Sequence, residues 1–173
     1  MTQLLKVFPG AQRALFAKYH IGGCRSCGFQ PTETLAEVCA RNDNLDVNEV
    51  IDHIRSSHDS DARIQITPRE LADRLPTESN LKILDARTRE EHEAVKLPGA
   101  QLLDQALIQT IFNSWGKDTP IVIYDHQGSR SLDAAAYFIG HGFAETKCLQ
   151  GGIDAYSVEV DQSLPRYTLE FAD

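Results

Sequence analysis

The chain has 173 residues, enough for one large domain or two small ones, and its hydrophobic content of 42% suits an ordinary globular core. Its formal net charge of -8, with 17 Lys and Arg against 25 Asp and Glu, argues against a nucleic-acid-binding protein, which would show a basic patch. No apolar run is long enough to span a membrane and no signal peptide opens the sequence, so we expect no membrane association and a cytoplasmic location.

Residues 1–58 are predicted to form a small all-α domain. Helical periodicity indicates a first helix within residues 9–19. Thr32 is the expected N-cap of a second helix, and Asp46, with a glutamate three residues later, is the expected cap of a third. The core available to such a unit is thin for its size, and units of this kind often need a staple or a docked neighbour.

Cys24 and Cys27 stand in a glycine-rich loop of this first domain. Two thiols at this spacing can form a redox disulfide, share a metal or hold a persulfide. Cys39 is a possible third metal ligand, and His20 or His53 a possible fourth. We favour a redox or binding role for the pair without a metal, and we expect Cys39 in the core. A metal ion or an iron–sulfur cluster at Cys24 and Cys27 is the alternative.

The first domain also resembles a known module. Residues 8–11, 23–28, 33–35 and 45–47 are similar to the small helical domain associated with hybrid-cluster proteins. That domain is thought to carry a redox disulfide, and the resemblance maps this pair onto Cys24 and Cys27. It names no substrate.

A polar stretch follows the helical domain. Residues 56–63 contain no large apolar side chain, which predicts a solvated linker. We place that linker at residues 59–63. Residues 64–173 then form the second domain.

The second domain is predicted to be α/β, with a parallel sheet flanked by helices. Thr67 and Thr88 each begin a capping box that opens a helix. Strands alternate with these and further helical segments, as in a parallel sheet with right-handed crossovers. Asp85 and Arg87 follow the first main strand, and we expect them to brace the neighbouring loops. The expected strands cover residues 81–84, 101–103, 121–124 and 147–150.

The loop after the central strand is the candidate site. The apolar strand at residues 121–124 stops at Asp125, and a helical segment begins a few residues later. This layout brings backbone N–H groups to a helix N-terminus, beside Arg130, and such a turn suits an anion. Asp125, at the base of the loop, is itself an anion. The candidate residues of the loop are Asp125, His126, Gln127, Gly128, Ser129, Arg130 and Ser131.

Four blocks of this domain stand in the order and at the spacings of a rhodanese homology domain: residues 84–91, 97–100, 124–131 and 149–152. The resemblance implies a fold in which sulfane sulfur is moved from donors such as thiosulfate through a cysteine persulfide. The family's catalytic cysteine opens the six-residue loop. In this sequence the resemblance places Asp125 at that position.

The substitution changes the expected chemistry of the loop. A carboxylate cannot form a persulfide, and its charge opposes the entry of an anionic donor. We therefore expect Asp125 to be inactive in sulfur transfer and to fill the anion cradle itself. A role as nucleophile, as in aspartyl-phosphate chemistry, is disfavoured because no metal constellation or lysine supports it. Cys148 lies in an apolar strand and is expected to be buried.

Two other loop residues have less definite roles. We expect His126 to be a solvated loop histidine, because neighbouring loop side chains usually point apart. Arg130 has two equally weighted interpretations: a structural pair with Asp125 or Glu91, or contact with a ligand.

The leading functional hypothesis is a rhodanese-like protein that is inactive as a sulfurtransferase at its loop. It would serve as a redox- or sulfur-linked binding or regulatory module whose partner is a protein or a small anion. The first alternative is a sulfurtransferase or disulfide oxidoreductase acting through Cys24 and Cys27. The second is a metal or iron–sulfur binder that uses the first domain. The sequence leaves the partner and the oligomeric state open.

Overall fold

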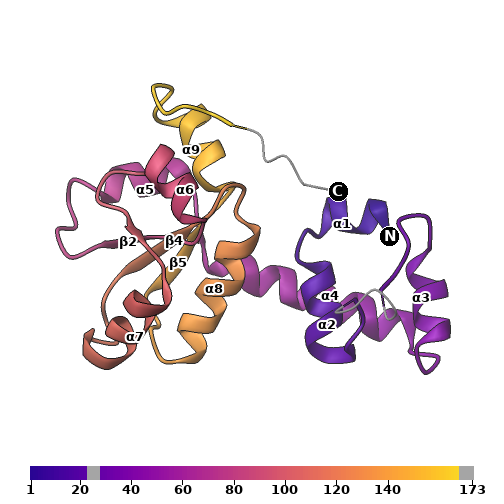
Figure 1. The fold of residues 1–173 in the computed structure, drawn as a ribbon. Coiled ribbons are helices and arrows are strands. Elements are labelled where there is room, and N and C mark those ends of the chain that lie inside the picture. The colour runs from indigo at the N-terminus through magenta and orange to yellow at the C-terminus, as the bar shows by residue number, and fades with distance from the viewer. Residues whose placement is uncertain (23–27, 168–173) are drawn as a thin grey trace. The chain divides into compact units, whose positions relative to one another are not determined.

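The computed structural model describes residues 1–22 and 28–167. The chain divides into two compact units, Met1–Arg63 and Ile64–Asp173 (Figure 1). Each unit has its own hydrophobic core. Among the described residues, no helix is both long and apolar enough to cross a membrane.

The first unit is helical in its described part. Thr34, rather than the expected Thr32, caps α3, because its hydroxyl accepts from the Glu37 N–H while the Glu37 carboxylate accepts from the Thr34 N–H. Asp46 caps the next helix as predicted, accepting from the Asn48 and Glu49 N–H groups. The helices are α1 (Thr2–Val7), α2 (Ala11–Tyr19), α3 (Leu35–Arg41) and α4 (Val47–Arg63).

The core of this unit forms where α2, α3 and α4 meet. Leu15, Val38, Val50 and Ile54 are buried there together with Cys39. The prediction that Cys39 is a core residue is confirmed. Burial raises the pKa of its thiol, which keeps it protonated and unreactive at neutral pH.

The segment predicted as a linker is helical instead. α4 continues to Arg63, so residues 59–63 form its last turns. The physical reason is a charge pair: Asp61 is buried and its carboxylate pairs with the partly exposed Arg13 on α2. A polar stretch can therefore be anchored as a helix when one of its acids has a partner far away in the sequence.

The second unit is built on a five-stranded parallel sheet with strand order β1-β5-β4-β2-β3. β4 lies in the middle and all four of its residues are buried, which explains its continuous apolar sequence. This confirms the predicted parallel α/β fold. The strands are β1 (Gln65–Ile66), β2 (Lys82–Asp85), β3 (Gln101–Leu102), β4 (Ile121–Tyr124) and β5 (Thr146–Leu149).

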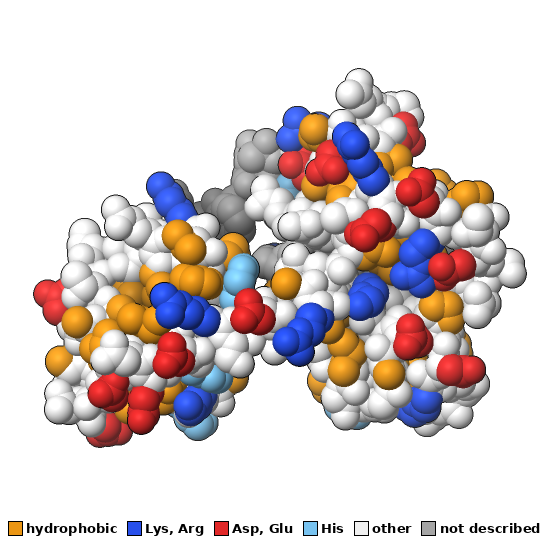
Figure 2. All heavy atoms as spheres, turned by 180° about the vertical axis from the view of Figure 1, so that it is seen from behind, with side chains coloured by type: hydrophobic (Ala, Val, Ile, Leu, Met, Phe, Trp, Pro, Cys, Tyr) orange, Lys and Arg blue, Asp and Glu red, His pale blue; other side chains and the backbone are white. Residues whose placement is uncertain are grey.

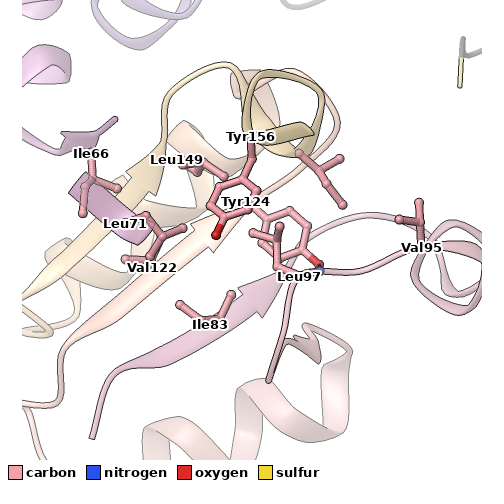
Figure 3. Packing of buried hydrophobic residues seen from close by; sticks show 10 residues of the cluster. Ile66, Leu71, Ile83, Val95, Leu97, Val122, Tyr124, Leu149 and Tyr156 are labelled. Atoms are coloured by element: carbon pink, nitrogen blue, oxygen red, sulfur yellow. The ribbon is translucent and has the colours of Figure 1, made fainter. Parts of the chain in front are cut away.

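Helices cover both faces of this sheet (Figure 1). Side chains alternate along β4, so Val122 and Tyr124 join one hydrophobic cluster and Ile121 and Ile123 join the other. Figure 3 shows the first cluster, in which Tyr124 packs among aliphatic side chains and Tyr156. The helices are α5 (Pro68–Arg74), α6 (Arg89–Ala94), α7 (Gln105–Ser114), α8 (Ser129–Gly140) and α9 (Gly152–Glu159).

The helix starts of the second unit follow local chemistry. Thr67 and Thr88 form complete capping boxes with Glu70 and Glu91, as predicted.

On the face drawn in Figure 2, acidic and basic side chains are interspersed over the second unit, with hydrophobic side chains between them.

Candidate functional site

The candidate loop lies at the carboxyl edge of the parallel sheet. β4 ends at Tyr124, Asp125 follows directly, and α8 begins at Ser129. β2 pairs with β4 in parallel and ends at Asp85, so both aspartates stand at the same edge. In open parallel sheets this edge is where ligands bind.

The Asp125 carboxylate is turned into the loop, and the residue is only 4% exposed. It accepts hydrogen bonds from the N–H groups of Gly128 and Arg130, the latter at 2.7 Å. The Ser131 hydroxyl donates a third bond at 3.2 Å. Donors that could hold a bound anion are therefore directed at the side chain of the loop's own first residue.

The main chain of this loop is held by α9. The Asp125 and His126 carbonyl oxygens accept from the N–H groups of Ile153 and Asp154, at 2.9 and 3.1 Å. A Cβ atom at Gly152 would overlap both carbonyl groups, and the φ of Gly152 is 62°. Glycine at this position is thus required by the close approach of the two backbones.

Asp85 is the centre of a buried polar network beside the loop. Its carboxylate accepts from Arg87 Nε at 2.8 Å and Nη2 at 2.6 Å, and from the Tyr124 hydroxyl at 2.7 Å. His92 Nδ1 lies 2.8 Å from Asp85 Oδ2. Burial alone would raise the pKa of this carboxyl, but its hydrogen bonds, led by that from Arg87, outweigh burial and lower the pKa.

Arg87 extends this network to the C-terminal part of the unit. Its Nη2 donates to the Val95 carbonyl at 2.5 Å, and its Nη1 donates to the Tyr167 hydroxyl at 2.8 Å. The Tyr167 hydroxyl in turn donates to Glu91 at 2.7 Å. Burial and the bond to Glu91 raise the pKa of Tyr167 to about 12, so it stays a donor at neutral pH.

His126 differs from its expected state. It was predicted to be solvated, but it is 8% exposed and its ring packs on the Tyr167 ring with 4.4 Å between centroids. Within residues 1–22 and 28–167, its buried Nδ1 has no hydrogen-bond partner. The cause is a contact with a residue 41 positions later, which no local pattern indicates. Tyr167, like His92 beside Asp85, is a site residue that was not predicted from the sequence.

Arg130 makes neither of the two ion pairs considered for it. Its main-chain N–H binds Asp125, but in the described part of the chain its guanidinium pairs with neither Asp125 nor Glu91. Arg130 is exposed, as are Gln127 and Ser129. The outer side of the loop therefore presents one cation and two neutral polar side chains to solvent.

The cysteines do not supply a nucleophile near the loop among the described residues. Cys148 is buried in β5, as predicted, and Cys39 is buried in the first unit. Cys24 and Cys27 lie outside the described residues. Within those described, no group of three or more His, Cys, Asp or Glu side chains is arranged to hold a metal ion.

Comparison with known proteins gives a consistent family. Residues 67–159 match the family model described as a rhodanese-like domain. The probable adenylyltransferase/sulfurtransferase MoeZ of Mycobacterium tuberculosis is 35% identical over 104 residues, which cover 59% of this chain but only 26% of that protein. A sulfurtransferase of Allochromatium vinosum is 32% identical over 93 residues, covering 54% of this chain and 87% of that protein.

A solved structure shows the same fold. The solution structure of the rhodanese-like domain of the Anabaena protein Alr3790 superposes with a TM-score of 0.51 at 21% identity. The superposition covers 64% of this chain and 89% of that one.

Proposed function

The chain belongs to the rhodanese-like domain family, and from this premise we propose that its loop after β4 does not carry sulfur and instead serves a binding or regulatory role linked to redox or sulfur chemistry. We infer that Asp125 occupies the position of the family's nucleophile. The single observation that carries the proposal is the Asp125 carboxylate, buried and hydrogen-bonded to two main-chain N–H groups and one hydroxyl.

The chemistry of the loop supports this proposal. Sulfur transfer needs a thiolate that attacks a sulfane sulfur and then stores it as a persulfide. A carboxylate oxygen does not form that product. An anionic donor such as thiosulfate would also meet a fixed negative charge, and the donors that would stabilise it already bind Asp125.

The outer side of the same loop offers a different use. Arg130, Gln127 and Ser129 are exposed around a turn whose main-chain N–H groups at residues 128 and 130 bind the Asp125 carboxylate. An arginine in this setting can bind a carboxylate or another oxyanion bidentately. A protein partner with an acidic side chain, or a small anion, is the ligand class that fits this surface.

The test restores a thiol to the cradle. The wild type is expected to show no thiosulfate:cyanide turnover. The thiolate introduced by Asp125→Cys is expected to attack the sulfane sulfur of thiosulfate, whose S–S bond breaks with release of sulfite. The protein then gains one sulfur atom as a persulfide, measured by intact-protein and peptide mass spectrometry. Ser129→Cys is the matched control: it places a thiol on the exposed side of the same loop, away from the donors that bind Asp125, and should gain none.

Two results would contradict the proposal. One is wild-type sulfurtransferase activity that persists in Asp125→Ala, because a cysteine elsewhere would then do the work. The other is a folded Asp125→Cys protein that forms no persulfide, because the loop would then not be a sulfur-transfer site with its nucleophile replaced. Circular dichroism of each variant establishes that it is folded.

A second candidate function is sulfur transfer or disulfide exchange through Cys24 and Cys27. The chain has four cysteines, and the two described ones, Cys39 and Cys148, are buried. Any thiol chemistry of this protein would thus fall to the other pair, which lies outside the described residues. An added sulfur on Cys24 or Cys27 after treatment with a sulfane donor supports this function, and unmodified thiols contradict it. Metal analysis of protein purified without oxygen separates it from a metal or iron–sulfur site.

A further inference from the structure

Residues 164–167, here called the strap, lie against the candidate loop within the second unit. They belong to no helix or strand. Arg166 donates from Nε and Nη2 to the Asp154 carboxylate at 2.7 and 3.1 Å. Leu164 and Tyr167 pack against the hydrophobic cluster on that side of the sheet. The strap is therefore fixed mainly by side-chain contacts.

Each of these contacts falls on an element that positions the loop. Asp154 is in the first turn of α9 and its N–H binds the His126 carbonyl. The Tyr167 ring covers the His126 ring, and its hydroxyl joins Arg87 to Glu91. The strap thus connects the loop after β4, the loop after β2 and the starts of α6 and α9.

We expect the strap to detach from the unit at a lower free energy than the helices and strands around it. A segment without main-chain ladder hydrogen bonds opens at lower free energy than the strands and helices around it. Release also exposes His126 Nδ1, a buried nitrogen that has no hydrogen-bond partner among the described residues, so hydration of that atom offsets part of what the strap loses. The Arg166–Asp154 pair is exposed on the arginine side and is screened by salt.

We propose that the strap is an intramolecular cover of the loop after β4, and that a partner or ligand gains access to His126 and the loop main chain only when the strap is displaced. The proposal rests on the function proposed above, since it assigns a means of regulation to the same loop. Displacement would remove the Tyr167 ring from His126 and break the link between Arg87 and Glu91.

The first test measures the accessibility of His126 in the full chain. Diethyl pyrocarbonate modifies exposed histidines, and peptide mass spectrometry gives the rate at His126 relative to His20, an exposed histidine of the first unit. Tyr167→Ala should raise that relative rate about tenfold or more, since it removes a ring contact and two hydrogen bonds to charged groups. Tyr167→Phe keeps the ring and should give a smaller increase. Tyr137→Ala, which removes a half-exposed tyrosine of α8, should leave the rate unchanged.

An unchanged His126 rate in Tyr167→Ala, with circular dichroism and thermal unfolding showing a folded protein, overturns the proposal. So does an equal increase in Tyr137→Ala, because the effect would then be a general loosening of the unit.

The second test asks whether the strap limits access to the cradle. With thiosulfate as the probe, Asp125→Cys combined with Tyr167→Ala should form persulfide faster than Asp125→Cys alone. If the single variant forms persulfide and the double variant is no faster, the strap proposal fails while the proposed function stands. If neither forms persulfide, the proposed function fails and the His126 modification rate decides on the strap.

Discussion

Asp85 is the central residue of the buried polar network beside the candidate loop. It has no exposed surface, yet it carries a charge, because Arg87, Tyr124 and His92 surround its carboxylate. A buried ion of this kind is tolerated only when its partners satisfy it, and removing one partner leaves the other charge uncompensated.

We therefore expect Asp85→Asn to lower the free energy of unfolding at pH 7 by about 3–5 kcal/mol, because the Arg87 guanidinium stays buried without its counter-ion. Urea unfolding followed by circular dichroism measures this difference. Asp118→Asn, at an exposed aspartate of the same unit, is the control and should change stability by less than about 0.5 kcal/mol.

The difference in unfolding free energy between wild type and Asp85→Asn should also depend on pH, and the sign of this dependence follows from the pKa of Asp85. The pKa of Asp85 is lowered in the folded state, so its ionised form contributes stability that is complete above the ordinary carboxyl value of 3.8. That contribution is lost as the pH falls through the lower folded-state pKa. The gap between the unfolding free energies of wild type and Asp85→Asn should narrow as the pH falls below 3.8. A gap that widens in acid contradicts this assignment.

Some contacts of single residues can be predicted from the sequence, and others cannot. The direction of the Asp125 side chain follows from local geometry, because a carboxylate at the base of a strand–loop–helix turn faces N–H groups a few residues later. The burial of His126 could not be inferred, since it depends on Tyr167, which is separated from it by α8, β5 and α9. Polar side chains at the ends of long loops carry no periodic signal.

Among the elements, α5 and α6 begin at side-chain caps that were predictable from three or four residues, whereas α8 and α9 begin at glycines without a side-chain cap. Thr67 accepts from the Glu70 N–H, and the Glu70 carboxylate accepts from the Thr67 N–H. Thr67→Ala should lower the free energy of unfolding by about 1 kcal/mol through loss of the capping bond. Thermal and urea unfolding measure the change. Thr110→Ala, at an exposed site inside α7, should stay within about 0.5 kcal/mol of wild type. Equal losses in both would show that the cap contributes nothing specific.

Gly152, where α9 begins after β5, is required to be glycine for two reasons that can be tested separately: its backbone conformation and the space around it. Gly152 has a φ of 62°, and a Cβ atom there would overlap the Asp125 and His126 carbonyl groups. Gly99 has a similar φ of 72°, but a Cβ atom there meets nothing within 4 Å. Gly99→Ala should thus cost only the strain of the left-handed conformation, about 1–2 kcal/mol.

Gly152→Ala should cost clearly more, about 3 kcal/mol or greater, because backbone must shift to relieve the overlap. It should also raise the rate of amide hydrogen exchange at Ile153 and Asp154, whose N–H groups bind the loop carbonyls. Exchange followed by mass spectrometry tests this. Equal losses of stability in the two variants would mean that the close contact at Gly152 is absorbed without cost.

β1, which is only two residues long, was not among the expected strands, but the order of the α/β elements after it was predictable because apolar strands and capping boxes are local signals. Two elements of the first unit were not. α1 is six residues long and its N-cap makes no side-chain hydrogen bond, so it lacks both a period and a start signal. The last turns of α4 were predicted to be a linker because the stabilising partner of Asp61 is Arg13, on another helix.

At the scale of the whole molecule, the described residues form three buried hydrophobic clusters that have no residue in common. One cluster lies entirely within Met1–Arg63, and the other two lie within Ile64–Asp173, on the two faces of the sheet. The rhodanese-like match, residues 67–159, falls inside the second unit. Among the described residues, the contacts cited above that position the candidate loop, including those of the strap, lie within the second unit.

This arrangement predicts that a fragment of residues 64–173 folds alone. Its size is typical of an independent domain, and both faces of its sheet are covered by its own helices. The fragment should unfold in one cooperative transition, and Gly152→Ala should lower the midpoint of that transition as it does in the full chain. Thermal circular dichroism of the fragment, with and without the substitution, makes the comparison.

The fragment of residues 1–63 is the counterpart and should be the weaker of the two. A unit of this size buries a smaller share of its surface on folding, so its stability is marginal. Its midpoint should lie below that of residues 64–173. A fragment of residues 64–173 that shows no cooperative transition, or one in which Gly152→Ala has no effect, would mean that the second unit depends on the first for its fold and that the candidate loop is not a property of the second unit alone.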